Sequence, residues 1–133
     1  MCGIAGIVSL REGLEPPAAD PLLAMAGALR HRGPEEAGIY RDRCAGLSHT
    51  RLSIVDLATG QQPLCNEDRT LWIVFNGEVF NYPELREELD ATGHRFATRS
   101  DTEVIVHAYE AWGDEAFRRF NGQWSVAIWN SRE

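Results

Sequence analysis

The chain has 133 residues, a length that fits one domain with a real hydrophobic core. Its 44% hydrophobic and 25% charged residues are typical of a globular protein and argue against disorder. The formal net charge of −7 argues against nucleic acid and anionic membranes as partners, and no apolar run is long enough to span a bilayer. We therefore expect a cytoplasmic protein with neither partner.

Five short strands are predicted from apolar or β-branched runs. They cover residues 3–9, 37–40, 46–55, 70–75 and 123–129. The fourth strand is expected to stop at Asn76-Gly77, and a long irregular loop is expected over residues 56–68. The last run is apolar on both faces, which predicts a strand inside a covered sheet.

Three helices are predicted from apolar periodicity and from residues that begin or end helices. They cover residues 20–30, 81–89 and 100–112. Asn81 with Glu84 and Ser100 with Glu103 have the spacing of capping boxes, and Gly113 is expected to end the third helix. This alternation predicts an α+β or layered sandwich fold, and the abrupt end after a covered strand indicates a fragment.

The cysteines and histidines do not suggest a metal site. The three cysteines, Cys2, Cys44 and Cys65, are odd in number and lack a C-x-x-C spacing, which suits a reducing compartment. Nothing in the sequence brings two of the four histidines to a ligand spacing with a carboxylate. We therefore expect no bound metal.

Cys2 is the first candidate for chemistry, because removal of Met1 would make it the N-terminal residue. Its thiol and its new α-amine would titrate near ~8.5 and ~7.7–8.0, so the amine could accept the thiol proton. A nucleophile and a base would then lie on one residue. The alternative is a buried cysteine at the start of a core strand.

Three further polar features interrupt apolar segments, and each has two interpretations. Asn76-Gly77 is either a hairpin turn or a pair of neutral donors for an oxyanion. Arg51, in the middle of an apolar strand, needs either a structural carboxylate or a substrate carboxylate as its partner. Asp101 either complements the dipole of the helix that it begins or holds a substrate ammonium. An arginine and an aspartate together would suit the zwitterion of an α-amino acid.

Six motifs together carry a family resemblance. In chain order they are Met1-Cys2-Gly3-Ile4-Ala5-Gly6, His31-Arg32-Gly33-Pro34, Arg51-Leu52-Ser53-Ile54-Val55-Asp56-Leu57, Gln62-Pro63-Leu64, Phe75-Asn76-Gly77-Glu78 and Ser100-Asp101-Thr102-Glu103. The chain resembles the class II glutamine amidotransferase domain, an N-terminal-nucleophile hydrolase, in the form found in glutamine-hydrolysing asparagine synthetase. The resemblance implies a four-layer αββα sandwich with antiparallel sheets, truncated at the C-terminus. Residues 1–133 would be the N-terminal part of the glutaminase domain, with the synthetase domain absent from this chain.

The resemblance also implies catalytic roles at matching positions. Cys2 would attack the side-chain amide of L-glutamine and form a thioester, with its own α-amine as base and then acid. Asn76 and Gly77 would stabilise the oxyanion. Water would then release glutamate.

The same resemblance assigns the substrate-binding residues. Arg51 would bind the α-carboxylate of glutamine, and Asp101 would bind its α-ammonium. The rest of the pocket would come from Ile54, Val55 and Glu78.

The expected partner is an asparagine synthetase-type domain, in cis or in trans, that receives the ammonia. No nucleotide site is expected in this chain because it has no P-loop, so ATP and Mg²⁺ would bind only the absent domain. A homodimer is one candidate assembly. Two alternatives stay open: the glutaminase domain of another class II amidotransferase, and a truncated relative that binds glutamine without turnover.

Overall fold

The computed structural model describes residues 1–10, 15–53, 56 and 58–132. Its strands are β1 (Gly3–Val8), β2 (Glu36–Arg41), β3 (Ala45–Arg51), β4 (Leu64–Cys65), β5 (Leu71–Val79) and β6 (Gly122–Asn130). Its helices are α1 (Ala19–Ala28), α2 (Tyr82–Ala91), α3 (Asp101–Trp112) and the 3₁₀ helix η1 (Gly113–Arg118). All strand pairs are antiparallel, which confirms the predicted mixed α+β class with antiparallel sheets.

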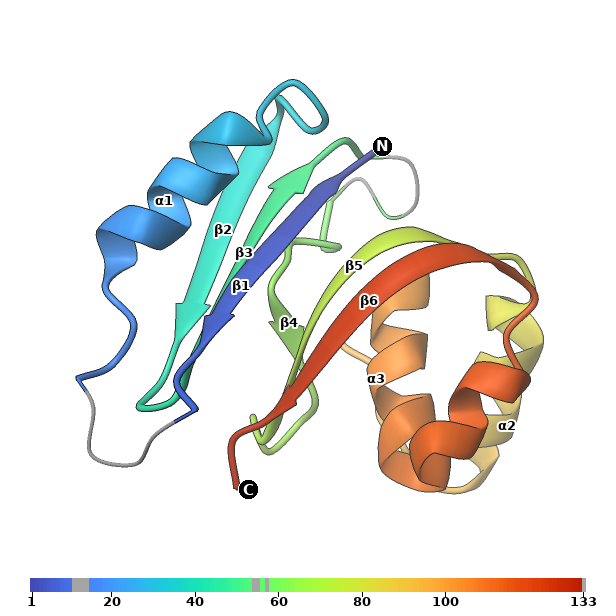
Figure 1. The fold of residues 1–133 in the computed structure, drawn as a ribbon. Helices are drawn as coiled ribbons and strands as arrows, with labels where there is room; N and C mark the ends of the chain where they lie inside the picture. Colours follow the sequence, from blue (N-terminus) through green and yellow to red (C-terminus); the bar gives the residue numbers. More distant parts are fainter. Residues whose placement is uncertain (11–14, 54–55, 57, 133) are drawn as a thin grey trace.

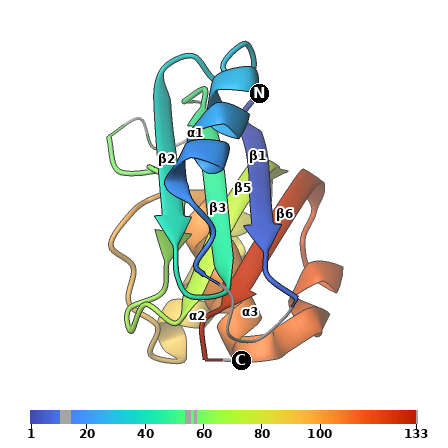
Figure 2. The same ribbon diagram turned by 60° about the vertical axis from the view of Figure 1, so that its left-hand side comes forward.

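Two three-stranded sheets face each other between layers of helix (Figures 1 and 2). The first sheet has the strand order β1-β3-β2, and α1 packs against it. The second has the order β4-β5-β6, and α3 packs against β5 while α2 packs against α3. Strand β5 also contacts both β1 and β3. The start of the chain therefore lies across from the middle of the second sheet.

The main hydrophobic core lies between the second sheet and its two helices. Its buried members include Ile73, Phe75, Val79, Leu85, Leu89, Val104 and Ile105. Successive side chains of a strand point to opposite faces, so alternate residues of β5 supply this core. The residues between them face the first sheet, and that face of β5 is free to carry polar groups.

The prediction that Asn76-Gly77 ends a strand is wrong. Strand β5 continues to Val79, and Gly77 pairs with Trp124 of β6. A Cβ on Gly77 would lie 2.5 Å from Trp124 Cα and closer still to the carbonyl oxygen of Gln123. Glycine is therefore needed here for the close approach of β6 and not for a turn.

Three other strand predictions differ from the structure. The segment predicted as an irregular loop contains β4, which pairs with β5. Strand β3 ends at Arg51, while Ile54 and Val55 lie outside the described residues. Strand β6 lies at an edge of the second sheet and its first four residues are exposed. Within the described residues, the prediction of a strand inside a covered sheet is therefore wrong for β6.

The expected capping box at Asn81 is also wrong, because its side chain makes other bonds. The Asn81 amide nitrogen donates to the carbonyl oxygen of Arg119 at 2.9 Å, and its oxygen accepts from the Asn121 N–H at 2.8 Å. These bonds join the start of α2 to the segment before β6. Asn81 therefore connects two elements and does not cap its own helix.

The second capping box is half confirmed. The Ser100 hydroxyl accepts from the backbone N–H of Glu103, as the spacing predicts. The Glu103 carboxylate instead accepts from the backbone N–H groups of Ala97 and Thr98, both at 2.7 Å. The helix ends at Gly113 with a positive φ of 56°, as predicted.

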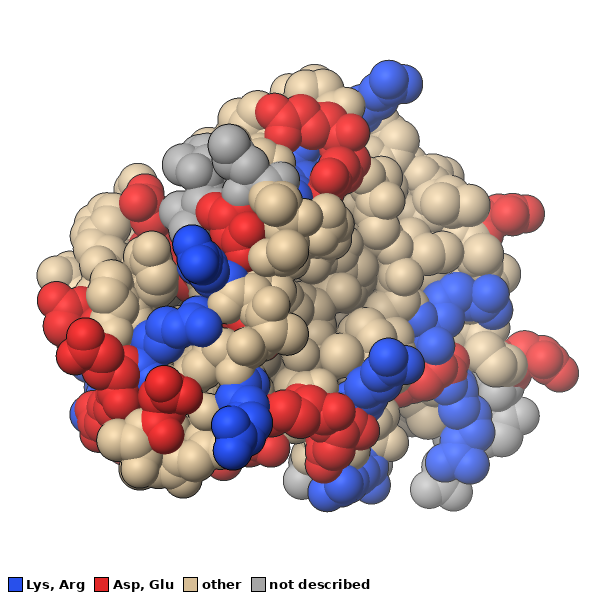
Figure 3. Space-filling model, turned by 180° about the vertical axis from the view of Figure 1, so that it is seen from behind, with Lys and Arg blue, Asp and Glu red and all other residues tan. Residues whose placement is uncertain are grey.

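The surface carries both signs of charge. Seen from behind, acidic and basic side chains are interspersed around an uncharged centre (Figure 3). Among the described residues, no helix is long and apolar enough to cross a membrane.

Candidate functional site

A pocket of about 140 Å³ lies where the two sheets meet the start of α3. Six of the eight predicted site residues line it: Cys2, Arg51, Asn76, Gly77, Glu78 and Asp101. The other two, Ile54 and Val55, lie outside the described residues. These six residues are up to 99 positions apart in the sequence.

Cys2 lies just before β1, against the segment that leaves β3. Its Sγ is 3.4 Å from the backbone nitrogen of Leu52 and 3.6 Å from the Leu52 carbonyl oxygen. The backbone carbonyl of Cys2 accepts from Arg32 Nε at 2.9 Å. This bond holds the backbone of Cys2 in place just before the strand. Met1 lines the same pocket and is 61% exposed. The thiol is half-buried in the pocket wall, where it can reach a bound molecule.

Arg51 is the last residue of β3 and is buried. Its Nη1 lies 3.1 Å from an oxygen of Glu36, its neighbour across the β2–β3 ladder. Its Nη2 donates to the carbonyl oxygen of Asp56, and a Cβ on Gly60 would lie 2.8 Å from that nitrogen. The structure thus supplies a structural carboxylate for Arg51. A guanidinium has five N–H donors, so further donors remain for the pocket.

Strand β5 contributes Asn76, Gly77 and Glu78 to the pocket. Phe75 packs in the core on the helical side, so the pleat turns Asn76 and Glu78 toward the first sheet. Gly77 keeps β6 close to the strand. A neutral amide and a backbone segment without a side chain therefore lie beside each other in the same wall as Cys2.

Asp101 begins α3 and is buried. Its Oδ2 accepts from the backbone N–H of Val79 at 3.1 Å, which ties the helix to the end of β5. Burial raises the pKa of its carboxyl above the usual value, against the lowering effect of this hydrogen bond. A carboxylate removed from water in a pocket wall is suited to pair with an ammonium group.

Gln62 also lines the pocket, although no role beyond its motif was predicted for it. Its Oε1 accepts from the backbone N–H of Phe75 at 2.6 Å, and its Nε2 donates to the Thr102 hydroxyl at 3.2 Å. One side chain therefore ties β5 to α3 beside the pocket. The Gln62-Pro63-Leu64 motif was the available signal, but the partners of Gln62 come from tertiary structure.

The structure brings two histidines close to carboxylates, although no spacing in the sequence had indicated this. His94 and His107 lie together with Glu67 and Glu110, outside the pocket that contains Cys2. His107 and Glu110 are three positions apart on α3, but no local spacing indicated that Glu67 and His94 would lie beside them.

Comparison with known proteins shows which family the chain resembles. The family model described as "Glutamine amidotransferase domain" matches residues 1–133. The chain is 41% identical to asparagine synthetase [glutamine-hydrolyzing] 1 of Bacillus subtilis over 134 residues, covering 100% of this chain and 21% of that protein. It is 43% identical to a probable asparagine synthetase [glutamine-hydrolyzing] of Dictyostelium discoideum, covering 99% of this chain and 24% of that protein.

A solved structure shares the fold at lower identity. Glutamine phosphoribosylpyrophosphate amidotransferase of B. subtilis superposes with a TM-score of 0.69 and 21% identity, covering 98% of this chain and 35% of that one. At that identity the likeness shows the fold alone. The chain spans about a fifth to a quarter of the length of the two curated relatives.

Proposed function

The chain belongs to the glutamine amidotransferase domain family, homologous to the N-terminal domain of glutamine-hydrolysing asparagine synthetases, and from this premise we propose that it hydrolyses L-glutamine to glutamate and ammonia. The observation that carries the proposal is that Cys2, Arg51 and Asp101 line one pocket. A thiol, a guanidinium and a carboxylate are the groups that a hydrolase of an α-amino acid amide needs. The reaction class follows from this set together with the family.

The proposed nucleophile is Cys2 after removal of Met1. The new α-amine accepts the thiol proton while Sγ forms a bond to the amide carbon of glutamine. The amine then returns the proton to the nitrogen as the C–N bond breaks, which releases ammonia and leaves a thioester. Water attacks the thioester, the C–S bond breaks, and glutamate leaves with the thiol restored. The exposure of Met1 supports the first step, because a processing enzyme can reach it.

The proposed oxyanion donors are the Asn76 side-chain amide and the Gly77 backbone N–H. Both belong to β5, whose backbone is paired with β6 at these two positions, so the Gly77 N–H is held in place as charge develops on the oxygen. Loss of one such donor typically raises the barrier by about 2.7–4 kcal/mol. The position of these residues beside Cys2 in the pocket supports the assignment.

Glutamine is held at its α-carbon in this proposal. Arg51 binds the α-carboxylate with donors that Glu36 and the Asp56 carbonyl do not use, and Asp101 binds the α-ammonium. Glu78 lines the same wall and completes the recognition. Ile54 and Val55, which lie outside the described residues, remain proposed substrate-binding residues on the family resemblance alone.

The layers of helix and sheet are proposed to be part of a four-layer N-terminal-nucleophile hydrolase sandwich. Residues 1–133 are proposed to be the N-terminal part of that domain.

The proposed recipient of ammonia is an ATP-dependent synthetase domain, in cis or in trans, that makes asparagine from aspartate. The two relatives described above are an asparagine synthetase and a probable asparagine synthetase, which supports this partner. ATP and Mg²⁺ would belong to that domain and not to this chain.

The experiment is a glutaminase assay on the mature chain that measures glutamate and ammonia together. We expect the two products in equal amounts, and we expect Cys2→Ala to abolish both. Cys65→Ala is the matched control, because Cys65 is also free and half-buried but does not line the pocket. Turnover by Cys2→Ala at the rate of the parent would contradict the proposal, as would glutamine binding by the mature parent without glutamate release.

A further inference from the structure

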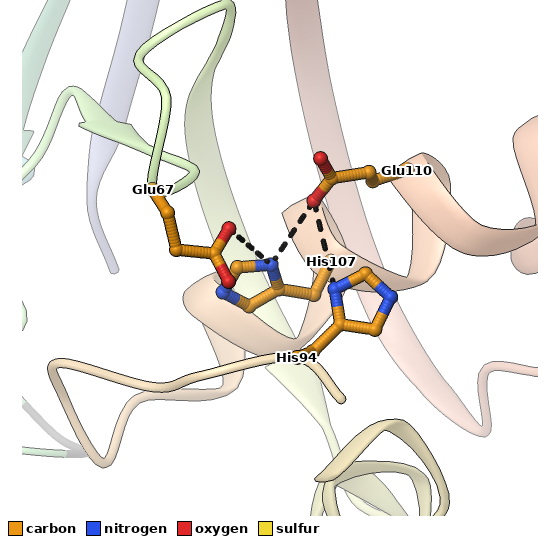
Figure 4. Close-up of side chains that lie close together, drawn as sticks. All are labelled: Glu67, His94, His107 and Glu110. Carbon is orange, nitrogen blue, oxygen red and sulfur yellow. Dashed lines mark hydrogen bonds and ion pairs between the residues drawn. The ribbon is translucent and has the colours of Figure 1, made fainter. Parts of the chain in front are cut away.

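Four side chains outside the pocket converge from three segments (Figure 4). Glu67 comes from the loop between β4 and β5, His94 from the segment after α2, and His107 and Glu110 from α3. One ligand atom from each residue lies within 4.8 Å of those of the other three. None of the four lines the pocket that contains Cys2.

Three of the six separations between these atoms are close to those in a tetrahedral metal site. His107 Nδ1 lies 3.3 Å from Glu110 Oε2 and 3.5 Å from Glu67 Oε2, and His94 Nδ1 lies 3.6 Å from Glu110 Oε2. Around a tetrahedral zinc ion with bonds of about 2.0–2.1 Å, neighbouring ligand atoms are about 3.3 Å apart. The other three pairs lie within 4.8 Å, so an inward movement of the side chains would bring all four atoms to bonding distance.

Both carboxylates are held so that one oxygen remains for the cluster. Glu110 Oε1 accepts from Asn66 Nδ2 at 3.1 Å, and its Oε2 faces the histidines. Glu67 Oε1 accepts from the backbone N–H of Arg95 at 3.0 Å, and its Oε2 faces His107. Such outer bonds orient metal ligands and reduce the freedom that they lose on binding.

The buried histidine has the environment of a metal ligand. The His107 side chain is 1% exposed, and its Nε2 has no hydrogen-bond partner among the described residues. That atom faces Glu103 Oε1 at 3.8 Å, and Glu103 is itself held by the N–H groups of Ala97 and Thr98. At 3.8 Å the two atoms are not hydrogen-bonded, but a closer approach of this carboxylate would fix the histidine tautomer and strengthen the ring as a metal ligand. Nδ1 is then the nitrogen free to bind a metal.

We propose that Glu67, His94, His107 and Glu110 form a binding site for a divalent transition-metal ion of the zinc type. Two imidazoles and two carboxylates are ligands for such ions, whereas Mg²⁺ and Ca²⁺ favour sites made of oxygen atoms. Four protein ligands fill a tetrahedral shell, which is the pattern of structural zinc sites and not of catalytic ones. The ion would join the middle of α3 to the two loops that flank it. The pocket chemistry does not depend on it.

The test is a titration of the full 133-residue chain with zinc, monitored by calorimetry. The chain is first treated with a chelator to remove any bound metal. We expect one zinc ion per chain and a thermal midpoint that rises when zinc is added. Cobalt(II) gives a second readout, because a four-coordinate cobalt site absorbs visible light. His94→Gln and Glu110→Gln should each weaken zinc binding by at least ~10-fold, since each removes a proposed ligand. Both side chains are partly exposed, so these variants are expected to fold.

The controls separate this cluster from other donors in the chain. His31→Gln removes an exposed histidine far along the sequence from the cluster, and Cys2→Ala removes the pocket thiol. Both should bind zinc as the parent does. Failure of the parent to bind zinc would overturn the proposal, as would unchanged affinity in folded His94→Gln and Glu110→Gln. Loss of binding in Cys2→Ala would also overturn it, because the metal would then lie at the thiol.

Discussion

Arg51 shows how one buried cation can have both a structural and a binding role. Its terminal nitrogens are engaged by Glu36 and by the carbonyl of Asp56, so the fold does not leave the charge unpaired. Gly60 lies against the guanidinium and leaves no room for a side chain at that position. The guanidinium is therefore held in one orientation at the pocket wall, which suits recognition of a planar carboxylate.

Arg51→Lys is expected to raise KM for glutamine by roughly 10-fold or more, with a smaller effect on kcat. The substitution keeps the charge but removes the paired donors, and a hydrogen bond to a charged group is worth about 1.5–3 kcal/mol. The contact with the α-carboxylate exists in the ground state and the transition state alike, so binding is lost and not the chemical step. Steady-state kinetics of glutamate release measures both constants.

Glu36→Gln is the matched control for Arg51→Lys. It removes the structural carboxylate at 3.1 Å and leaves the guanidinium in place, so KM should stay close to that of the parent. An unchanged KM in Arg51→Lys, or a fall confined to kcat, would show that Arg51 does not bind the substrate carboxylate.

Strand β5 is the element on which the site depends. It is the central strand of the second sheet, and it supplies core residues to one side and pocket residues to the other. Gly77 is a point where β6 lies too close to β5 to leave room for a side chain. The geometry of the proposed oxyanion donors therefore depends on this contact.

Gly77→Ala should lower the free energy of unfolding by about 1–3 kcal/mol, the usual cost of forcing extra atoms into a packed site. It should also sharply reduce glutamate release, because the added Cβ would push β6 away from the pocket wall. Urea unfolding and the glutaminase assay measure the two effects. Gly27→Ala in α1 is the control, since nothing lies within 4 Å of its added Cβ. The free energy of unfolding of that control should be higher than that of the parent by about 0.5–1 kcal/mol, because alanine favours a helix more than glycine does.

Equal stability of Gly77→Ala and the parent would show that β6 can move without cost. In that case the tight β5–β6 contact would not be what holds the pocket wall.

The sequence predicted those elements whose signals are local. The apolar runs of β1 and β5 and the Ser100 cap of α3 are examples, because periodicity and capping act within a few residues. Asn76-Gly77 was wrongly predicted to end the strand because the pair favours turns. Only the close approach of β6 in the structure shows why a glycine is needed there. Strand β4 has two residues and depends on its pairing with β5. A strand this short has no periodicity from which it could be predicted.

At the scale of the whole molecule, the two sheets are joined through a buried histidine. His49 of β3 is 1% exposed, and its Nε2 lies 3.2 Å from the carbonyl oxygen of Phe75 in β5. Burial lowers the pKa of His49 to about 4, and the charge of Arg51 acts in the same direction. A neutral imidazole can donate its Nε2–H to that carbonyl. His49 therefore joins the sheets without a charge.

The free energy of unfolding should fall as the pH is lowered from about 6.5 to about 4. An unfolded histidine takes up a proton near ~6.5, whereas folded His49 does so only near 4, so the unfolded state holds more protons in this window. The loss at the acidic end is roughly 3 kcal/mol from this group. Urea unfolding at several pH values, for the parent and for His49→Gln, measures it.

His49→Gln should show a shallower dependence on pH across that window, because the variant has no imidazole to protonate. Other acidic groups titrate in both proteins and cancel in the comparison. Parallel curves for the two proteins would show that His49 is not the group responsible.

The site was predictable where the resemblance supplied it, and only in part from the residues alone. The pocket gathers Cys2, Arg51, Asn76 and Asp101 from four separate segments, and no spacing in the sequence shows that they meet. The resemblance named these residues, while Gln62 had no role until its bonds to β5 and α3 were visible. In the cluster around His107, helix spacing places Glu110 beside His107, but Glu67 and His94 arrive only through the packing of α3 beside two loops, which the sequence could not predict.

The central claim is that an N-terminal Cys2 is the nucleophile of a glutamine pocket built by these residues. The most direct test is the intact mass of the chain before and after exposure to a diazo-ketone analogue of glutamine. The account predicts a chain without Met1 that gains one adduct, located on Cys2 by peptide mapping and absent from Cys2→Ala. A mature chain that stays unlabelled, or a Cys2→Ala chain that gains the same adduct, would contradict it.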